Sequence, residues 1–326
     1  MSELRWHPVL RQWVITATQR QDRTFLPPRE YCPLDPTKPG GFPTELERPS
    51  FEIAVFENRF PSLRREPPEP AIEPEGPFDV RPAQGVCEVV VYTPEHDTTL
   101  AQQSVEHIRR LIAVWTDRYA ELGALPYVEY VFIFENKGEV IGVTLHHPHG
   151  QIYAYPFVPP IAKQQLDSAR DHHSETGRCL FCELLERERE DGRRVLIEDE
   201  NFTAVIPFYA RWPYEVHVTP RRHIGALPEM TDSEAWSLAR TLKSILVGYD
   251  RLFGFSMPYI LAMHQAPTDG GEHLYAHLHI ELYPPHRTAT KLKYLAGSET
   301  GAGSFINDSL PEEKAVELRA ALPQRL

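Results

Sequence analysis

The sequence predicts an α+β fold in which two duplicated halves form one mainly antiparallel sheet flanked by helices. Three landmarks support this prediction, and each occurs once in each half: a Glu-Val-x-Val run that ends in histidine, a long helix-like stretch and a His-x-His motif. They recur in the same order and at nearly the same separation, which indicates a duplication. We therefore expect an N-terminal unit at residues 1–160 and a C-terminal unit at residues 161–326.

The first landmark is a strand-like run rich in valine, a residue that favours pleated structure. Residues 88–96 read EVVVYTPEH and residues 215–223 read EVHVTPRRH. Both runs end at a histidine, His96 in the first half and His223 in the second. Each run therefore predicts a strand that carries a histidine just beyond its end.

The second landmark is a helix of about twenty residues. Residues 104–123 and 231–254 each begin with a capping candidate, Ser104 or Thr231, and an acidic residue follows soon after. This combination is typical of a helix N-terminus. Strand-like runs at 127–136 and 257–266 come next, and the His-x-His motifs follow them.

Composition limits the classes of function. Of 326 residues, 41% are hydrophobic and 25% charged, which is typical of a soluble globular protein. The net charge of −12 argues against a nucleic-acid backbone as the main partner. The chain shows neither a membrane-length apolar run nor the layout of a signal peptide, so we expect a cytoplasmic protein whose four cysteines are reduced.

Prolines are unusually frequent, with 31 in the chain, and many lie in residues 61–82. This segment cannot form a helix, because proline lacks the backbone N–H and clashes with the preceding turn. An apolar strand-like run resumes directly after it. We therefore interpret 61–82 as a stiff excursion within the fold, and the sequence leaves open whether it covers the active site.

Each half also contains a set of metal-binding residue types. The second half offers Cys179, Cys182, His223 and His277, and a Cys-x-x-Cys pair with two histidines is typical of closed tetrahedral zinc sites. The alternative is two buried free cysteines and unrelated histidines. A metal at this set would join the His-x-His strand to the start of the half, so its predicted role is structural.

The corresponding set in the first half is Cys32, Asp35, His96 and His147. A carboxylate can replace a thiolate at zinc, but it is a harder and weaker donor. We therefore expect weaker zinc binding here, and a metal-free polar contact is the alternative. The chain as a whole would carry one or two zinc ions.

His149 lies two residues beyond His147 and is not needed as a metal ligand. Residues two apart on an extended strand face the same side, so Gln151 shares the face of His149. An imidazole is largely neutral at cytosolic pH and can attack phosphorus. The chain therefore offers His149 as a nucleophile, with Gln151 as a neutral hydrogen-bond donor.

Residues 134–157, FENKGEVIGVTLHHPHGQIYAYPF, resemble the active-site segment of the galactose-1-phosphate uridylyltransferase family, a branch of the histidine-triad superfamily. Further segments such as YCPLDP, FENRFPSL and HQAP extend the resemblance over nearly the whole chain. It implies ping-pong transfer of UMP from UDP-glucose to galactose 1-phosphate through a uridylyl-histidine at His149. It also implies that Gln151 donates to a phosphoryl oxygen.

The resemblance further implies a homodimer and a set of substrate-binding residues. Arg20 and Arg23 match the pair near the phosphates, and the planar guanidinium suits that task. Nucleotide and phosphate contacts correspond to Asn58, Asn136, Gly142 and Thr144. Lys293 and Glu299 match the tail that meets the hexose, often from the partner subunit.

Several residues depart from the family pattern. Asp35 replaces a cysteine, Arg59 stands where the best-known members have an aspartate against the ribose, and Ser298 replaces a tyrosine. The iron site of some members, one glutamate and three histidines, is not reproduced, because Gln165 and Glu281 fall at two of its positions. The Cys179–Cys182 set instead resembles the second zinc site of a plant relative that transfers AMP from ADP-glucose to phosphate.

Two alternative functions therefore stay open. One is a sister nucleotidyltransferase or phosphorylase acting on ADP-glucose or another sugar nucleotide. The other is a catalytically silent, zinc-stabilised binding protein. The joint presence of His149, Gly150, Gln151, Arg20 and Arg23 favours an enzyme over the silent alternative.

Overall fold

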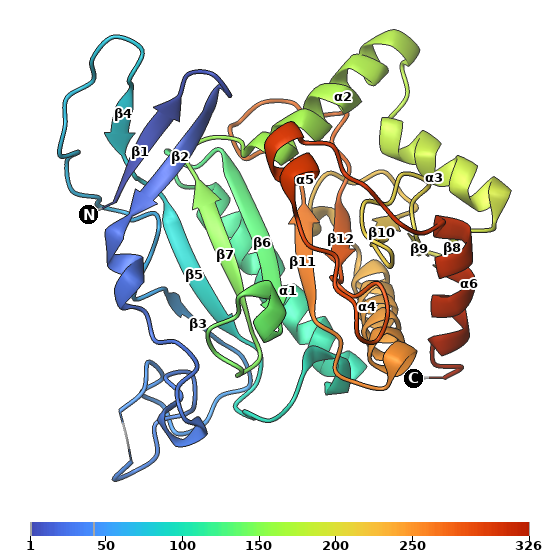
Figure 1. The fold of residues 1–326 in the computed structure, drawn as a ribbon, viewed down its shortest axis with the longest axis horizontal. Helices are drawn as coiled ribbons and strands as arrows, with labels where there is room; N and C mark the ends of the chain where they lie inside the picture. Colours follow the sequence, from blue (N-terminus) through green and yellow to red (C-terminus); the bar gives the residue numbers. More distant parts are fainter. Residues whose placement is uncertain (1, 42, 326) are drawn as a thin grey trace.

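The computed structural model describes residues 2–41 and 43–325 and is built around a nine-stranded sheet (Figure 1). Every neighbouring pair in this sheet is antiparallel, and the order is β3-β5-β7-β6-β11-β12-β10-β9-β8. The predicted α+β class with a large antiparallel sheet is thus confirmed. The strand bounds are Ala54–Glu57 (β3), Val86–Val91 (β5), Tyr130–Lys137 (β6), His149–Tyr155 (β7), Val195–Glu198 (β8), Phe202–Val205 (β9), Val216–Pro220 (β10), Tyr259–His264 (β11) and His279–Tyr283 (β12).

The six inner strands of the sheet are arranged symmetrically about the β6–β11 pair, where the two halves of the chain meet. In the first half β5 pairs with β7 and β7 with β6, and in the second half β10 pairs with β12 and β12 with β11. Each half inserts one long helix at the equivalent place, between β5 and β6 in the first half and between β10 and β11 in the second. This repeated connectivity agrees with the duplication that the sequence predicts.

The two long helices are α1 (Val105–Gly123) and α4 (Asp232–Phe253). The side chains of Ser104 and Thr231 cap them by accepting hydrogen bonds from the third residue of each helix, as predicted. Apolar residues at helical spacing bury one face of each helix against the sheet. The resulting core includes Ile108, Leu111, Trp115, Leu238, Leu242, Ile245, Ile133, Ile152, Leu261 and Ile280.

Because α1 and α4 occupy one face of the sheet, functional side chains gather on the opposite face. Alternation along β7 directs Ile152 and Ala154 into the helix-covered core, and it directs Tyr153 into a smaller cluster on the other side. Leu4 of a separate three-stranded sheet packs into that cluster. This second sheet has the order β2-β1-β4, with bounds Gln12–Ala17, Ser2–His7 and Val80–Pro82.

Four shorter α-helices and several 3-10 turns complete the described part of the chain. Among these described residues, no helix combines the length and the apolar character needed to cross a membrane. Residues 61–82 contain no helix, as predicted, and their end forms β4. The α-helices are α2 (Pro160–Thr176), α3 (Leu180–Asp191), α5 (Gly297–Ala302) and α6 (Pro311–Ala321).

Candidate active site and metal centres

His149 is the first residue of β7 and is partly buried. Its Nδ1 lies 2.7 Å from the carbonyl oxygen of His147. A carbonyl oxygen can only accept, so Nδ1 carries a proton and donates a hydrogen bond to that oxygen. In a neutral ring Nε2 then keeps its lone pair. Burial lowers the pKa of His149 below its usual value, which favours this neutral form.

A cavity of about 610 Å³ opens in front of His149. Six of the predicted site residues line it: Arg20, Arg23, Asn58, Thr144, His149 and Gln151. Arg59 lines it as well, but its Nη1 is paired with Glu45 at 3.1 Å. Arg20 and Arg23 therefore supply positive charge next to the nucleophile candidate, an arrangement that suits an anionic phosphate group.

Arg20 is held in place by three oxygen atoms. Its Nη1 donates to the Ser62 hydroxyl at 3.0 Å, to the Tyr153 hydroxyl at 3.1 Å and to the Phe60 carbonyl at 3.4 Å. The sequence did not single out Ser62 or Tyr153. The available signal was the alternation of β7, which places Tyr153 on the same face as His149 and Gln151.

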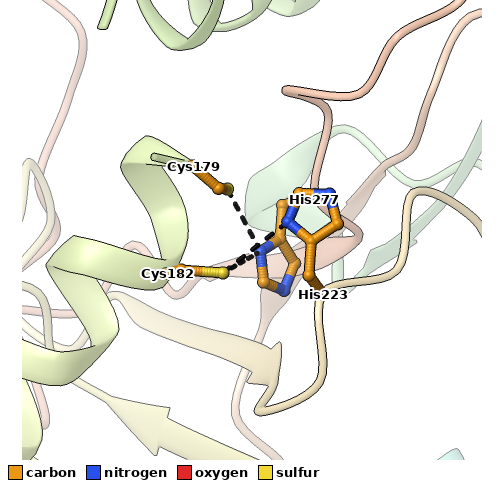
Figure 2. Close-up of side chains that lie close together, drawn as sticks. All are labelled: Cys179, Cys182, His223 and His277. Atoms are coloured by element: carbon orange, nitrogen blue, oxygen red, sulfur yellow. Dashed lines mark hydrogen bonds between the residues drawn. The ribbon is translucent and has the colours of Figure 1, made fainter. Parts of the chain in front are cut away.

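The predicted ligand set of the second half comes together at the start of α3 (Figure 2). The Sγ of Cys182 lies 3.4 Å from Nδ1 of His277 and 3.6 Å from Nδ1 of His223, and the Sγ of Cys179 lies 3.5 Å from Nδ1 of His277. Zinc bonds of about 2.3 Å to sulfur and about 2.0–2.1 Å to nitrogen place tetrahedral neighbours roughly 3.6 Å apart. The set therefore has the dimensions of a tetrahedral metal site.

Two further features fit this set to a metal. Cys179 caps α3 and Cys182 lies in its first turn, so the pair sits at a helix N-terminus rather than on an isolated turn. The neighbouring Cys182, together with the two nearby histidines, lowers the pKa of Cys179, which favours a thiolate. Nε2 of His277 lies 3.0 Å from the Pro220 carbonyl, and donation to that oxygen directs Nδ1 toward the sulfurs.

The first-half set, Cys32, Asp35, His96 and His147, also comes together, but with a different geometry. Oδ1 of Asp35 lies 2.8 Å from Nδ1 of both His96 and His147. These are hydrogen-bond distances, shorter than the roughly 3.4 Å expected between oxygen and nitrogen ligands of one zinc ion. Burial opposes ionisation of Asp35, yet the two histidines hold the pKa of its carboxyl below the usual value.

Comparison with known proteins gives consistent matches over nearly the whole chain. The model of the galactose-1-phosphate uridyl transferase N-terminal domain matches residues 1–159, and that of the C-terminal domain matches residues 165–325. A curated galactose-1-phosphate uridylyltransferase from Thermotoga maritima is 42% identical over 322 residues, covering 98% of each chain. The chain belongs to the galactose-1-phosphate uridylyltransferase family.

Solved structures of similar proteins agree with this membership. A structure described as that of a uridylyltransferase superposes with a TM-score of 0.87 at 36% identity, covering 98% of each chain. An ADP-glucose phosphorylase from Arabidopsis thaliana, solved with ADP-glucose, superposes with a TM-score of 0.73 at 26% identity and the same coverage. This member of the uridylyltransferase family therefore shares its overall architecture with both structures.

Four predicted substrate-binding residues lie outside the main cavity. Asn136 lines an adjoining cavity of about 380 Å³ that also reaches His149, and Gly142 ends a short turn between β6 and β7. Lys293 and Glu299 lie in the second half, where they form a buried ion pair at 2.9 Å. Neither Lys293 nor Glu299 lines either of these two cavities, and none of the described residues 61–82 lines them.

A third group of ligand-type residues lies in the second half of this family member. His264, His279 and Glu281 are buried, and their ligand atoms lie within 4.8 Å of one another. Gln165 donates to Oε1 of Glu281 at 2.9 Å. Gln165 and Glu281, which depart from the family's iron-site pattern, thus meet here. Two histidines with one carboxylate could hold a first-row transition metal. The resemblance places Gln165 and Glu281 at two positions of this pattern, but the sequence alone predicts no metal site from them.

Gly150 illustrates how tightly the nucleophile's strand is packed. A Cβ atom at this position would lie 2.2 Å from the Tyr92 hydroxyl oxygen. We expect Gly150→Ala to lower the free energy of unfolding by about 1–3 kcal/mol, because the extra methyl group overpacks the strand. Urea unfolding measures this loss, and Tyr92→Phe in the same chain should recover part of it.

Gly297→Ala is the matched control, because nothing lies within 4 Å of a Cβ atom at Gly297. This variant should unfold at nearly the urea concentration of the unmodified protein. Equal stability of Gly150→Ala and Gly297→Ala would contradict the packing explanation.

Proposed function

We propose that this protein moves UMP from UDP-glucose to galactose 1-phosphate through a covalent uridylyl-His149 intermediate. The observation that carries the proposal is the orientation of His149. Its Nδ1 is committed to the His147 carbonyl, so Nε2 is the nucleophilic atom in a cavity that also contains two arginines. Membership of the uridylyltransferase family supplies the substrate class.

In the first step Nε2 of His149 attacks the α-phosphorus of UDP-glucose. The N–P bond forms as the bond between the α-phosphorus and the bridging oxygen breaks, and glucose 1-phosphate leaves with the electron pair. In the second step a phosphate oxygen of galactose 1-phosphate attacks the same phosphorus and the N–P bond breaks. UDP-galactose leaves and His149 is restored.

Such a reaction depends mainly on positioning and charge neutralisation. Arg20 and Arg23 would neutralise the phosphates, and Gln151 would donate a hydrogen bond to a nonbridging phosphoryl oxygen. Nucleotide and phosphate contacts would come from Asn58, Asn136, Gly142 and Thr144. Lys293 and Glu299 would reach the hexose of a partner's site in a homodimer, because both lie away from the cavity of their own chain.

We further propose that the metal is zinc and that its role is structural. Cys179, Cys182, His223 and His277 would hold one ion, which would join the start of α3 to the segment before β12. The set with Cys32, Asp35, His96 and His147 would hold a second ion more weakly, because Asp35 is a harder ligand and is committed to two histidines. The zinc content, the homodimer and a cytoplasmic location remain predictions.

A second candidate function is transfer from an adenine nucleotide sugar. Two observations favour it: Arg59 lines the cavity, and the ADP-glucose phosphorylase shares the architecture. The test is incubation with α-labelled UDP-glucose or α-labelled ADP-glucose without acceptor. Base-stable, acid-labile label from UDP-glucose alone supports the first candidate, and label from ADP-glucose alone supports the second. No label from either would contradict both.

A further inference from the structure

We propose that Tyr153 is a positioning residue that orients the side-chain amide of Gln151 toward the phosphoryl group. The inference rests on the proposed function, because it concerns the donor that would meet the transferred phosphate. It adds a residue that does not itself touch the substrate. Tyr153 would act through Gln151, and Arg20 would fix Tyr153.

The strand β7 places the three side chains in a row. His149, Gln151 and Tyr153 alternate with core residues, so all three lie on the face that holds the cavity. His149 and Gln151 line that cavity, whereas Tyr153 is only 8% exposed and lies behind it. The Tyr153 ring packs edge-on against Phe134 with ring centroids 5.1 Å apart, which restrains the direction of its hydroxyl.

The hydroxyl of Tyr153 lies between a cation and an amide oxygen. Nη1 of Arg20 lies 3.1 Å from it, and a guanidinium can only donate, so the phenol oxygen accepts this bond. The phenol's own proton is then directed to Oε1 of Gln151, which lies 3.4 Å away and so makes a long hydrogen bond. The three groups form a directed chain in which Arg20 donates to Tyr153 and Tyr153 donates to Gln151.

This chain decides which end of the Gln151 amide faces the substrate. An amide has an accepting oxygen and a donating nitrogen, and a phosphoryl oxygen can be stabilised only by the nitrogen. Anchoring Oε1 on Tyr153 leaves Nε2 for the cavity. A rotated amide would instead direct its oxygen at the phosphate, and oxygen would face oxygen. The positive charge of Arg20 also polarises the phenol and strengthens its donation.

The test is a double-mutant cycle of Tyr153→Phe and Gln151→Ala, with kcat and KM measured for UDP-glucose and galactose 1-phosphate. Phenylalanine keeps the buried ring and removes only the hydroxyl. We expect Tyr153→Phe alone to lower kcat about three- to tenfold, the size of one hydrogen bond, with KM changed less than twofold. In the Gln151→Ala background the same change should alter kcat less than twofold, because no amide remains to be oriented and Arg20 keeps its bonds to Ser62 and Phe60.

Tyr155→Phe is the matched control. Tyr155 lies on the same face of β7 and packs in the same apolar cluster, but its hydroxyl does not belong to the Arg20 chain. Its kcat should stay within about twofold of the unmodified protein. An equal loss of kcat from Tyr153→Phe in both backgrounds, or no loss in either, would overturn the positioning role. An unmodified protein without transfer activity would overturn the proposed function, and the inference with it.

Discussion

Replacing His149 by alanine should lower the rate of uridylyl transfer by at least about a thousandfold while the fold is retained. The variant removes the only atom proposed to form the N–P bond, so neither half-reaction can follow the covalent route. The fold loses one hydrogen bond, from Nδ1 to the His147 carbonyl, which costs about 0.5–1.5 kcal/mol. Single-turnover labelling with UDP-glucose measures the first effect and urea unfolding the second.

His146→Ala is the matched control, because it removes a neighbouring imidazole from the same motif. The His146 side chain is 52% exposed and its Nε2 lies 3.2 Å from Glu139. We expect this variant to become labelled at nearly the normal rate. If His149→Ala became labelled and His146→Ala did not, the assignment of the nucleophile would be wrong.

The second large effect should come from the metal set of the second half. Cys179→Ala should remove about one zinc ion per chain and lower the free energy of unfolding by at least about 3 kcal/mol. A structural zinc site contributes its binding free energy to folding, which is of order 10 kcal/mol in small domains. Elemental analysis and urea unfolding, each with and without a chelator, measure the two quantities.

Cys87→Ala separates the loss of a ligand from the loss of a buried thiol. Cys87 is also buried, but it lies on β5 among apolar neighbours and outside both cysteine-containing ligand sets. This variant should keep its zinc. Its free energy of unfolding should fall only slightly, by the cost of the small cavity that the missing sulfur leaves. A Cys179→Ala protein that is as stable as Cys87→Ala and indifferent to chelator would contradict a structural metal site.

Much of the fold could be predicted because local signals and long-range spacing agree. Ser104 and Thr231 cap helices where the sequence places them, and the repeated landmarks fall on equivalent strands of one sheet. Both cysteine-containing sets also come together as predicted. The first histidine of each His-x-His motif also has the same kind of partner. Nε2 of His147 faces the Thr93 carbonyl, and Nε2 of His277 faces the Pro220 carbonyl. The likeness of the two halves thus extends to the orientation of these rings.

Other parts of the site depend on contacts that no local pattern encodes. Tyr153 reaches Arg20 across 133 positions of sequence, and Gln165 reaches Glu281 across 116. Single residues in such contacts carry no spacing signal, so only the folded chain places them together. The geometry at Asp35 was also unpredictable, because a carboxylate can serve as a metal ligand or accept hydrogen bonds from the same histidines.

The covalent intermediate is the central claim, and a chase experiment tests it most directly. The protein is labelled with α-labelled UDP-glucose, freed of small molecules and mixed with galactose 1-phosphate. We predict that the label leaves the protein and appears as UDP-galactose, in an amount equal to the label on His149. Label that stays on the protein, or that leaves only as UMP at a rate independent of galactose 1-phosphate, would contradict transfer through His149.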